Sequence, residues 1–192
     1  MIEIGILAAG LSSRLGRPKQ LVPFRGVPLI RHVVMAALRV KKATVTVIGN
    51  RAVDLTAAIG DLNINFMINP DPARGMGSTI KQAVSYAVEQ SRGACLIVLG
   101  DQPFVGTAHL QRLIDTSQVH PESIIATAYP GGGAGVPALF PAVFYPDLLA
   151  IGDDYGAKEV IRSTPHHVNL TVDQKSLFDV DTPADLASLS HF

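Results

Sequence analysis

The stretch IEIGILAAGLSSRLGRPK, residues 2–19, joins a short apolar run to a loop rich in glycine and serine. The apolar run predicts a buried strand, and the loop that follows it carries two separated cations, Arg14 and Lys19. Gly10 and Gly16 can adopt backbone angles that other residues resist, and they leave room for a ligand against the main chain. Because successive amide groups in such a turn form an anion-binding concavity, the stretch predicts a site for a polyphosphate.

This loop differs from the two best-known phosphate-binding motifs. A Walker loop requires G-x-x-x-x-G-K-[ST], but Gly10 and Gly16 are one residue too far apart, and Arg17 and Pro18 follow them. The dinucleotide fingerprint G-x-G-x-x-G is absent as well. A surface loop of ordinary turn residues is the alternative interpretation, so the other motifs of the chain must decide between the two.

Length and composition indicate a single folded domain. The chain has 192 residues, 47% of them hydrophobic, so we expect a single domain over residues 1–192 and exclude a disordered protein. Cys95 lies in the apolar run CLIVL, which predicts a buried thiol outside any disulfide and is typical of a reducing compartment. Because the sequence shows neither a signal-like segment nor a membrane span, we expect a cytoplasmic protein without a membrane partner.

The charges balance over the whole chain but not along it. Sixteen basic and sixteen acidic residues give a net charge of zero, so no nucleic-acid partner is expected. Residues 1–42 hold eight Lys or Arg and one acid, whereas residues 147–192 hold eight acids and three bases. A small anionic ligand together with a divalent cation would suit this asymmetry, although charges on solvated faces would also explain it.

Apolar runs alternate with helical patterns along most of the chain. Strands are expected at 2–7, 43–49, 64–68, 95–99 and 123–128, and helices at 28–40, 52–59, 78–88 and 107–114. This order predicts an α/β fold, a three-layer, doubly wound, Rossmann-like sandwich with a mainly parallel sheet. The glycine-rich stretch that starts at residue 130 interrupts the pattern, so residues 130–145 are expected to form a loop and a hairpin-like insertion.

Asp101 directly follows the apolar strand that ends in CLIVLG. In doubly wound sheets, ligands bind beyond the carboxyl ends of the strands, where the strand order reverses. A carboxylate at that edge, beside a phosphate-binding loop, is how proteins usually hold Mg²⁺. The alternative interpretation is an aspartate that only caps a turn or helix.

The segment FDVDTPADL, residues 178–186, supplies further acids. Asp179 and Asp181 are two residues apart, so on an extended segment their side chains share a face. Either Asp181 or Thr182 can cap the helix that Pro183 begins. A cap would explain Asp181 without a metal, but it would not explain Asp179.

Three further segments are glycine-rich loops that run toward regular elements. In NPDPARGMGSTIKQAV, residues 69–84, the glycines allow close approach of a ligand, and the backbone could pair with the edge of a nucleotide base. A plain capped helix start explains this segment equally. The stretches PGGGAGVPALF, residues 130–140, and GDDYGAKEVI, residues 152–161, are expected on the substrate side, with a flexible insertion and a solvated helix start as the alternatives.

Six motifs occur in one order over nearly the whole chain: LAAGLSSRLGRPKQL (7–21), GMGSTI (75–80), LGDQP (99–103), GGGAGVPALF (131–140), GDDYGAKEVI (152–161) and FDVDTP (178–183). Together they resemble the molybdenum cofactor nucleotidyltransferases, an NTP-transferase family. The sequence LAAG at residues 7–10 is most similar to the cytidylyltransferase branch, which joins CMP to molybdopterin. The guanylyltransferase branch usually carries two glycines at this position. CDP-methylerythritol synthases share the opening motif, but GGGAGVPALF with GDDYGAKEVI resembles the molybdopterin enzymes better.

This resemblance implies a Mg²⁺-dependent transfer of CMP from CTP to the phosphate of molybdopterin, with release of pyrophosphate and delivery to a molybdoenzyme. It implies catalytic roles for Arg14, Lys19 and Asp101, and a metal held by Asp101 with Asp181 or Asp179. The implied nucleotide-binding residues are Leu7, Ala8, Ala9, Gly10, Ser12, Ser13, Arg14, Lys19, Gly77 and Ser78. The implied acceptor-binding residues are Gly133, Gly135, Pro137, Asp154, Gly156 and Lys158.

Two positions depart from the pattern of the family. Ser13 stands where a second Arg is common, and Lys158 stands where Arg is frequent, so Lys158 cannot grip a phosphate with two parallel donors. Two alternative functions therefore remain: a nucleotidyltransferase for another phosphorylated acceptor, such as a sugar or polyol phosphate, and a non-catalytic chaperone that binds the pterin cofactor.

Overall fold

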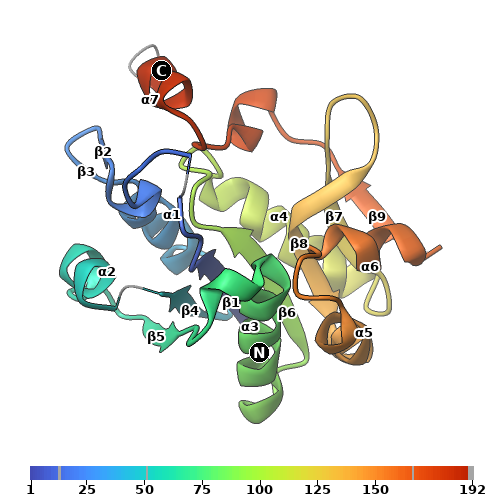
Figure 1. The fold of residues 1–192 in the computed structure, drawn as a ribbon. Helices are drawn as coiled ribbons and strands as arrows, with labels where there is room; N and C mark the ends of the chain where they lie inside the picture. The colour runs from blue at the N-terminus through green and yellow to red at the C-terminus, as the bar shows by residue number, and fades with distance from the viewer. Residues whose placement is uncertain (13, 51, 166, 190–192) are drawn as a thin grey trace.

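The computed structural model describes residues 1–12, 14–50, 52–165 and 167–189. Its centre is a seven-stranded sheet with the strand order β5-β4-β1-β6-β8-β7-β9 (Figure 1). These strands are β1 (Ile2–Ala8), β4 (Ala43–Gly49), β5 (Asn65–Ile68), β6 (Ala94–Leu99), β7 (Ile124–Ala128), β8 (Ala134–Pro141) and β9 (His167–Leu170). β8 runs antiparallel to β6 and β7, and the other strand pairs of this seven-stranded sheet are parallel. The mainly parallel sheet confirms the predicted fold class.

Helices cover both faces of the sheet. One face packs against α1 (Leu29–Leu38), α2 (Ala52–Ile59) and α4 (Thr107–Val119), and the other against α3 (Met76–Glu89), α5 (Tyr145–Ala150) and α6 (Lys158–Ser163). In α1 the buried residues Leu29, Ile30, Val33, Val34 and Ala37 recur at the helical spacing of one apolar face. The two helical layers with the sheet between them form the expected three-layer sandwich.

A smaller apolar cluster lies at one edge of the sandwich. It joins α7 (Pro183–Leu189) to the hairpin of β2 (Pro23–Phe24) and β3 (Val27–Pro28), with Val180 buried at its centre. Short 3-10 turns complete the chain: η1 (Lys19–Leu21), η2 (Pro72–Arg74), η3 (Ala142–Phe144) and η4 (Gln174–Leu177). Among the described residues, no helix is both long and apolar enough to cross a membrane.

The strand order reverses between β1 and β6. The chain runs outward from β1 to β4 and β5, and then returns to the other side of β1 with β6. The backbone N–H of Gly100 donates to the carbonyl oxygen of Leu7 at 2.9 Å, which continues this pairing beyond the end of β6. The loops that follow β1 and β6 therefore leave the sheet side by side, at the place where doubly wound folds bind ligands.

Residues 130–145 contain the predicted hairpin turn but are not an insertion, because residues 134–141 form β8, which pairs antiparallel with β7 in the interior of the sheet. Residues 131–133 have φ angles between 83° and 100°, which glycine tolerates, and they turn the chain back after β7. Pro137 lies where the register between β7 and β8 shifts, so its missing N–H interrupts no regular ladder bond. The sequence analysis also missed β9, α5 and the β2–β3 hairpin.

The central strand β6 is buried on both faces, as its continuous apolar run predicts. Cys95 in this strand is a fully buried free cysteine. Burial and the nearby charge of Glu3 raise the pKa of its thiol to about 12. The expectation of a buried thiol outside any disulfide is confirmed.

Candidate active site

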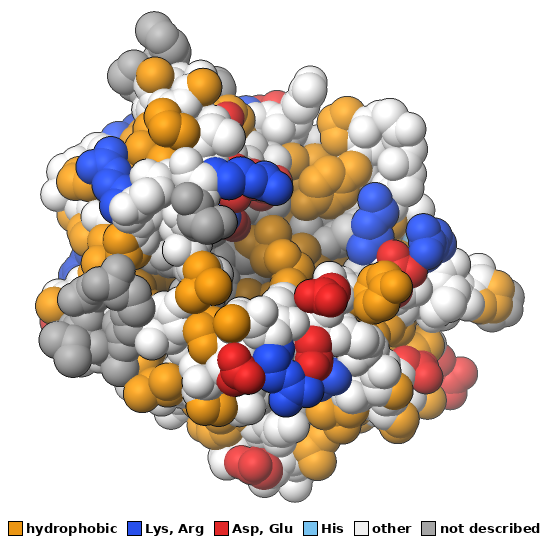
Figure 2. All heavy atoms as spheres, viewed as in Figure 1, with side chains coloured by type: hydrophobic (Ala, Val, Ile, Leu, Met, Phe, Trp, Pro, Cys, Tyr) orange, Lys and Arg blue, Asp and Glu red, His pale blue; other side chains and the backbone are white. Residues whose placement is uncertain are grey.

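A pocket of about 320 Å³ opens at the carboxyl ends of β1 and β6. Figure 2 shows a hollow on this face of the molecule, with hydrophobic side chains on its floor. The pocket is lined by Leu7, Ala9, Gly10, Leu11, Lys19, Gln20, Pro72, Ala73, Gly75, Met76, Thr79, Leu99 and Asp101. A mostly apolar lining with a few polar groups is typical of a small-molecule site.

A second hollow of about 430 Å³ is also lined by the loop that follows β1. Gly10, Leu11 and Pro72 line both hollows, and Ser12, Gly16 and Arg17 are among the residues that line only the second. The loop therefore borders two hollows.

Two buried or half-buried amides hold the backbone of this loop in place. Gln20, which is 3% exposed, donates from Nε2 to the carbonyl oxygens of Ala8 at 2.9 Å and Gly10 at 3.3 Å. Asn50 donates from Nδ2 to the carbonyl oxygen of Ala9 at 2.5 Å. With these carbonyls bound, the N–H groups of Gly10 and Leu11 have no protein acceptor in the described part of the chain. They are the donors that an anion would use.

Only one of the two glycines in the loop needs its conformational freedom. Gly16 has a φ of 69°, in the left-handed region that favours glycine. Gly10 is not among the residues with positive φ, and Ser12 takes a φ of 53° instead. The expectation of a special backbone angle is therefore wrong for Gly10, whose contribution is the open space above it: an added Cβ would meet only Gln20, at 4.0 Å.

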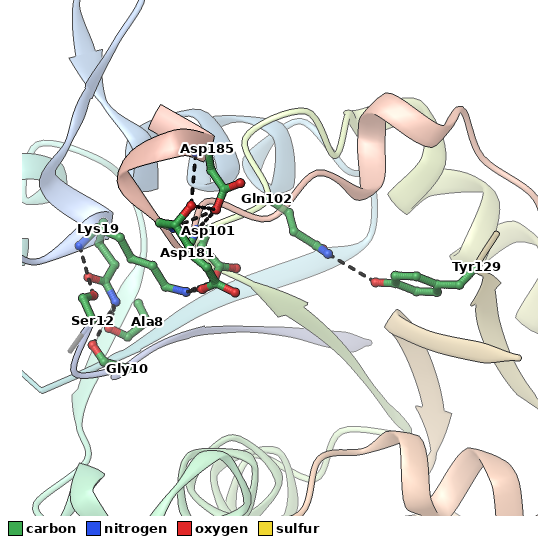
Figure 3. A network of polar contacts seen from close by, with 11 residues as sticks. Ala8, Gly10, Ser12, Lys19, Asp101, Gln102, Tyr129, Asp181 and Asp185 are labelled. Atoms are coloured by element: carbon green, nitrogen blue, oxygen red, sulfur yellow. Dashed lines mark hydrogen bonds and ion pairs between the residues drawn. The ribbon is translucent and has the colours of Figure 1, made fainter. Parts of the chain in front are cut away.

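Lys19 connects the loop to the acids of the site (Figure 3). Its ammonium forms an ion pair with Oδ2 of Asp101 and another with Oδ1 of Asp181 at 2.5 Å. The side chains of Lys19 and Asp101 are each 14% exposed. Burial alone would lower the pKa of Lys19, but the charges and hydrogen bonds of the two carboxylates outweigh it, so the pKa lies above its ordinary value.

A third carboxyl group, that of Asp179, lies beside these two. Burial and the negative charge of Asp101 raise the pKa of Asp179 to about 6. The backbone N–H of Val180 donates to the carbonyl oxygen of Asp101 at 3.2 Å, which holds this segment against the end of β6. Asp101 is thus a neighbour of Asp179 and Asp181 in the fold, although it is remote from them in the sequence.

The sequence allowed either Asp181 or Thr182 to cap the last helix, and in the structure Thr182 is the cap. Its Oγ1 accepts from the N–H of Asp185 at 3.2 Å, and Oδ2 of Asp185 accepts from the N–H groups of Asp181 and Thr182. This reciprocal arrangement is a capping box. The carboxylate of Asp181 takes no part in it and contacts Lys19 instead.

The acids fit a divalent cation as part of a site that substrate oxygens complete. Oδ1 of Asp101 and Oδ1 of Asp179 are buried and have no hydrogen-bond partner in the described structure. Among the described residues, no group of three or more His, Cys, Asp or Glu side chains is arranged to hold a metal ion by itself. One or two carboxylates with substrate phosphates are the usual ligands of Mg²⁺, so this incomplete set suits a metal that arrives with a nucleotide.

The expected base-reading residues Gly77 and Ser78 have protein partners. The N–H of Gly77 donates to the carbonyl oxygen of Asp153 at 2.8 Å, and the hydroxyl of Ser78 donates to the carbonyl oxygen of Gly75 at 2.7 Å. Asn69 donates to the hydroxyls of Ser78 and Thr79, at 2.8 Å and 3.0 Å. These contacts fix the start of α3, where Gly75, Met76 and Thr79 line the pocket.

The two expected acceptor segments belong to different elements, β8 with the turn before it and the loop that leads into α6, and β8 and α6 pack in the same core cluster. The first contains Gly133 in the turn between β7 and β8, with Gly135 and Pro137 in β8; Pro137 accepts a hydrogen bond from Thr127 at 2.6 Å. The second contains Asp154, Gly156 and Lys158, of which Asp154 and Lys158 are exposed. None of these six residues lines the pocket beside Asp101.

Asp153 attaches the second acceptor segment to α3. Its carboxylate forms ion pairs with Arg74 and, at 2.8 Å, with Lys81, and their hydrogen bonds lower its pKa. Close packing reinforces the attachment, because a Cβ on Gly77 would lie 2.3 Å from the carbonyl oxygen of Gly152. One wall of the pocket and the segment 152–156 are therefore a single packed unit.

The remaining predicted residues of the loop fall outside the pocket. Arg14 is exposed and lines neither hollow. Ser13 lies outside the described residues. Ala8 is buried and belongs to β1, where its carbonyl oxygen is the acceptor for Gln20.

Sequence reasoning missed the amides that organise the site. Asn50 and Asn69 directly follow the strands β4 and β5, and Gln20 and Gln102 lie within the quoted motifs. A polar amide immediately after an apolar strand is the signal that could have identified the two asparagines. Gln102 donates to the hydroxyl of Tyr129 at 3.2 Å, and that hydroxyl donates to the carbonyl oxygen of Val136 at 2.5 Å. This chain of bonds joins the loop after β6 to the β7–β8 hairpin.

Solved structures with a similar fold are found over the full length of the chain. The Rv0371c protein from Mycobacterium tuberculosis H37Rv is 28% identical, with a TM-score of 0.87, and the match covers 100% of this chain and 97% of that one. A structure of Rv0371C in complex with manganese is 26% identical, with a TM-score of 0.80 and coverage of 98% and 97%.

Curated relatives match by sequence over part of their length. The bifunctional protein GlmU of Leifsonia xyli subsp. xyli is 31% identical over 139 residues, which make up 70% of this chain and 29% of that protein. Residues 4–169 match the family described as the MobA-like NTP transferase domain. This match spans most of the sequence and includes the loop after β1, the start of α3 and Asp101. The chain therefore belongs to the family of MobA-like NTP transferase domains.

Proposed function

We propose that the protein, as one domain over residues 1–192, is a divalent-metal-dependent nucleotidyltransferase that transfers CMP from CTP to the phosphate of molybdopterin. The observation that carries this proposal is the meeting of the loop after β1 with Asp101 at one pocket, through Lys19. Cationic and amide donors for phosphates thus lie beside a carboxylate that can hold a metal.

The nucleotide would occupy the pocket between the loop and the start of α3. The free N–H groups of Gly10 and Leu11 would bind phosphate oxygens, and the apolar lining would cover the base. Ala9, which is 2% exposed and lines the pocket, is the residue on which the preference for CTP rests. Arg14, which is exposed, would reach the outer phosphates.

Asp101 and Asp181, with Asp179 beside them, would hold the divalent cation, for which Mg²⁺ is our choice. The manganese complex of the similar Rv0371C supports a divalent ion in this fold. When bound, such an ion supplies positive charge that neutralises the phosphates and orients them for in-line attack. None of the three carboxyl groups needs to act as a base. The acceptor is a phosphomonoester, whose second pKa is near 6, so it is already a nucleophilic dianion at neutral pH.

The acceptor phosphate would attack the α-phosphorus: a new phosphorus–oxygen bond forms while the bond to the leaving pyrophosphate breaks. Lys19 and Arg14 would offset the charge of that leaving group. The segments at 133–137 and 152–158 would face the pterin. Delivery of the product to a molybdoenzyme and a cytoplasmic location complete the proposal.

A sugar or polyol phosphate is the second candidate acceptor. The similarity to GlmU over 70% of the chain favours it, and so does Lys158, whose single ammonium offers no bidentate grip on a phosphate. The non-catalytic cofactor chaperone is disfavoured, because binding alone gives no reason for three neighbouring carboxyl groups.

The test is a transfer assay on the purified protein with Mg²⁺ and each of the four ribonucleoside triphosphates. Molybdopterin and hexose 1-phosphates serve as separate acceptors, and pyrophosphate release and the product mass are measured. We expect the CMP adduct of molybdopterin. Turnover with another triphosphate or with a sugar phosphate would refute the assignment of CTP and molybdopterin as substrates. Tight pterin binding without any turnover would refute the proposal that the protein is an enzyme.

A further inference from the structure

The ammonium of Lys19 occupies the position of a cation between two acids. It contacts Oδ2 of Asp101 and Oδ1 of Asp181, and the Lys19 side chain is only 14% exposed (Figure 3). Lys19 reaches these acids from η1, whereas Asp101 follows β6 and Asp181 precedes α7. The lysine therefore bridges three segments that are far apart in the sequence.

Without a cation, this part of the structure would hold uncompensated negative charge. Asp101 is as buried as Lys19, and the carboxyl group of Asp179 is close enough for the charge of Asp101 to act on it. Leaving such carboxylates unpaired is unfavourable, because like charges repel strongly where little water screens them. Lys19 supplies the missing positive charge in the absence of ligands.

The same oxygens are the ones a divalent cation needs. Carboxylate oxygens are the preferred ligands of Mg²⁺ and Mn²⁺, and a cation on Oδ2 of Asp101 and Oδ1 of Asp181 would stand where the ammonium is. Two cations cannot share that position. Lys19 has a flexible four-carbon stem and also lines the pocket, so its ammonium can turn from the acids toward bound phosphates.

We propose that Lys19 is a placeholder cation, which a divalent metal displaces from Asp101 and Asp181 and which then pairs with the phosphates of the nucleotide. This inference rests on the proposed function for the identity of the metal site. It assigns Lys19 two successive partners, first the carboxylates and then the phosphates. The exchange makes metal binding weak until a nucleotide offers the ammonium another partner.

The test measures Mn²⁺ binding to the nucleotide-free protein, from the paramagnetic resonance signal of free Mn²⁺. Replacing Lys19 by Met removes the competing charge, so Lys19→Met should bind Mn²⁺ at least about tenfold more tightly than the wild type. Lys81→Met is the matched control: Lys81 pairs with Asp153, and its loss should leave the Mn²⁺ affinity unchanged. In the double variant Lys19→Met/Asp101→Asn, the gain should disappear.

Lys19→Gln provides a second route if Lys19→Met does not fold. Its neutral amide can still donate to one of the carboxylates, and it should show the same gain in Mn²⁺ affinity. Unchanged or weaker Mn²⁺ binding by the folded variants would overturn the inference. This experiment measures no nucleotidyl transfer, so its result is separate from the proposed function. If the wild type catalyses transfer but the Lys19 variants bind Mn²⁺ no more tightly, only the role of Lys19 as a placeholder is refuted. If the variants bind Mn²⁺ more tightly but the wild type catalyses no transfer, only the proposed enzymatic activity is refuted.

Discussion

Replacing Gln20 by Leu tests whether a single buried amide holds the loop that follows β1. Leu is similar in size but cannot donate, so the carbonyl of Ala8, in a residue that is 1% exposed, loses its partner. A buried carbonyl left unpaired costs about 1–3 kcal/mol, and the half-buried bond to Gly10 is lost as well. We therefore expect Gln20→Leu to lower the free energy of unfolding by about 2 kcal/mol.

The assay is urea denaturation followed by circular dichroism, together with calorimetric titration of CTP in the presence of Mg²⁺. CTP binding should weaken by about tenfold, because the amides of the loop lose their fixed position. Gln111→Leu is the matched control: Gln111 accepts from the N–H of Lys41 at 2.9 Å on the surface, and its loss should change stability by less than about 0.5 kcal/mol. If Gln20→Leu is no less stable than Gln111→Leu, the amide does not hold the loop.

Three further predictions concern single groups. Asp101→Asn should reduce pyrophosphate release by at least about a hundredfold at an unchanged circular dichroism spectrum, and wild-type turnover in this variant would exclude Asp101 from the metal site. Burial and the charge of Arg112 lower the pKa of His109 to about 4, below its unfolded value, so the native state excludes a proton and stability should fall as the pH drops from about 6.5 to 4. When the free energy of unfolding in urea is measured at each pH, His109→Gln should lack this loss of stability. The same pH dependence in the wild type and in His109→Gln would show that His109 does not cause it. Cys95, with a pKa raised to about 12, should resist iodoacetamide in the native protein at pH 8 and react in urea, as mass spectrometry can show.

The ion pairs of Lys19 with Asp101 and Asp181 can be compared with the role that the family resemblance gives to Lys19. The resemblance gives Lys19 a role toward phosphates, whereas in the ligand-free fold its ammonium is bound to two acids. The two roles are compatible only if the lysine moves, which the Mn²⁺ experiment tests. Arg14 has no such partner among the described residues and can meet phosphates without a rearrangement.

Much of the fold follows from local patterns in the sequence. The strands β1, β4 and β6 and the helix α1 were expected within one or two residues of their observed bounds, because the period of apolar residues is a local property. The position of Asp101 beside the loop after β1 was also foreseeable, since the carboxyl ends of parallel neighbours meet at one edge. The sequence by itself therefore determined the layers and the edge of the sheet at which the loop after β1 meets Asp101.

Only the tertiary structure decided the partners of these residues. Lys19 and Asp181 are separated by 162 positions, and no local period encodes that they touch. Thr182 rather than Asp181 became the helix cap because Asp185 stands one turn further on, which left the carboxylate of Asp181 free for Lys19. Likewise, β8 became an interior strand because a glycine turn reverses the chain and the space between β6 and β7 accepts it, even with a proline. Such choices depend on which distant groups the packed sheet brings together, and that information exists only in three dimensions.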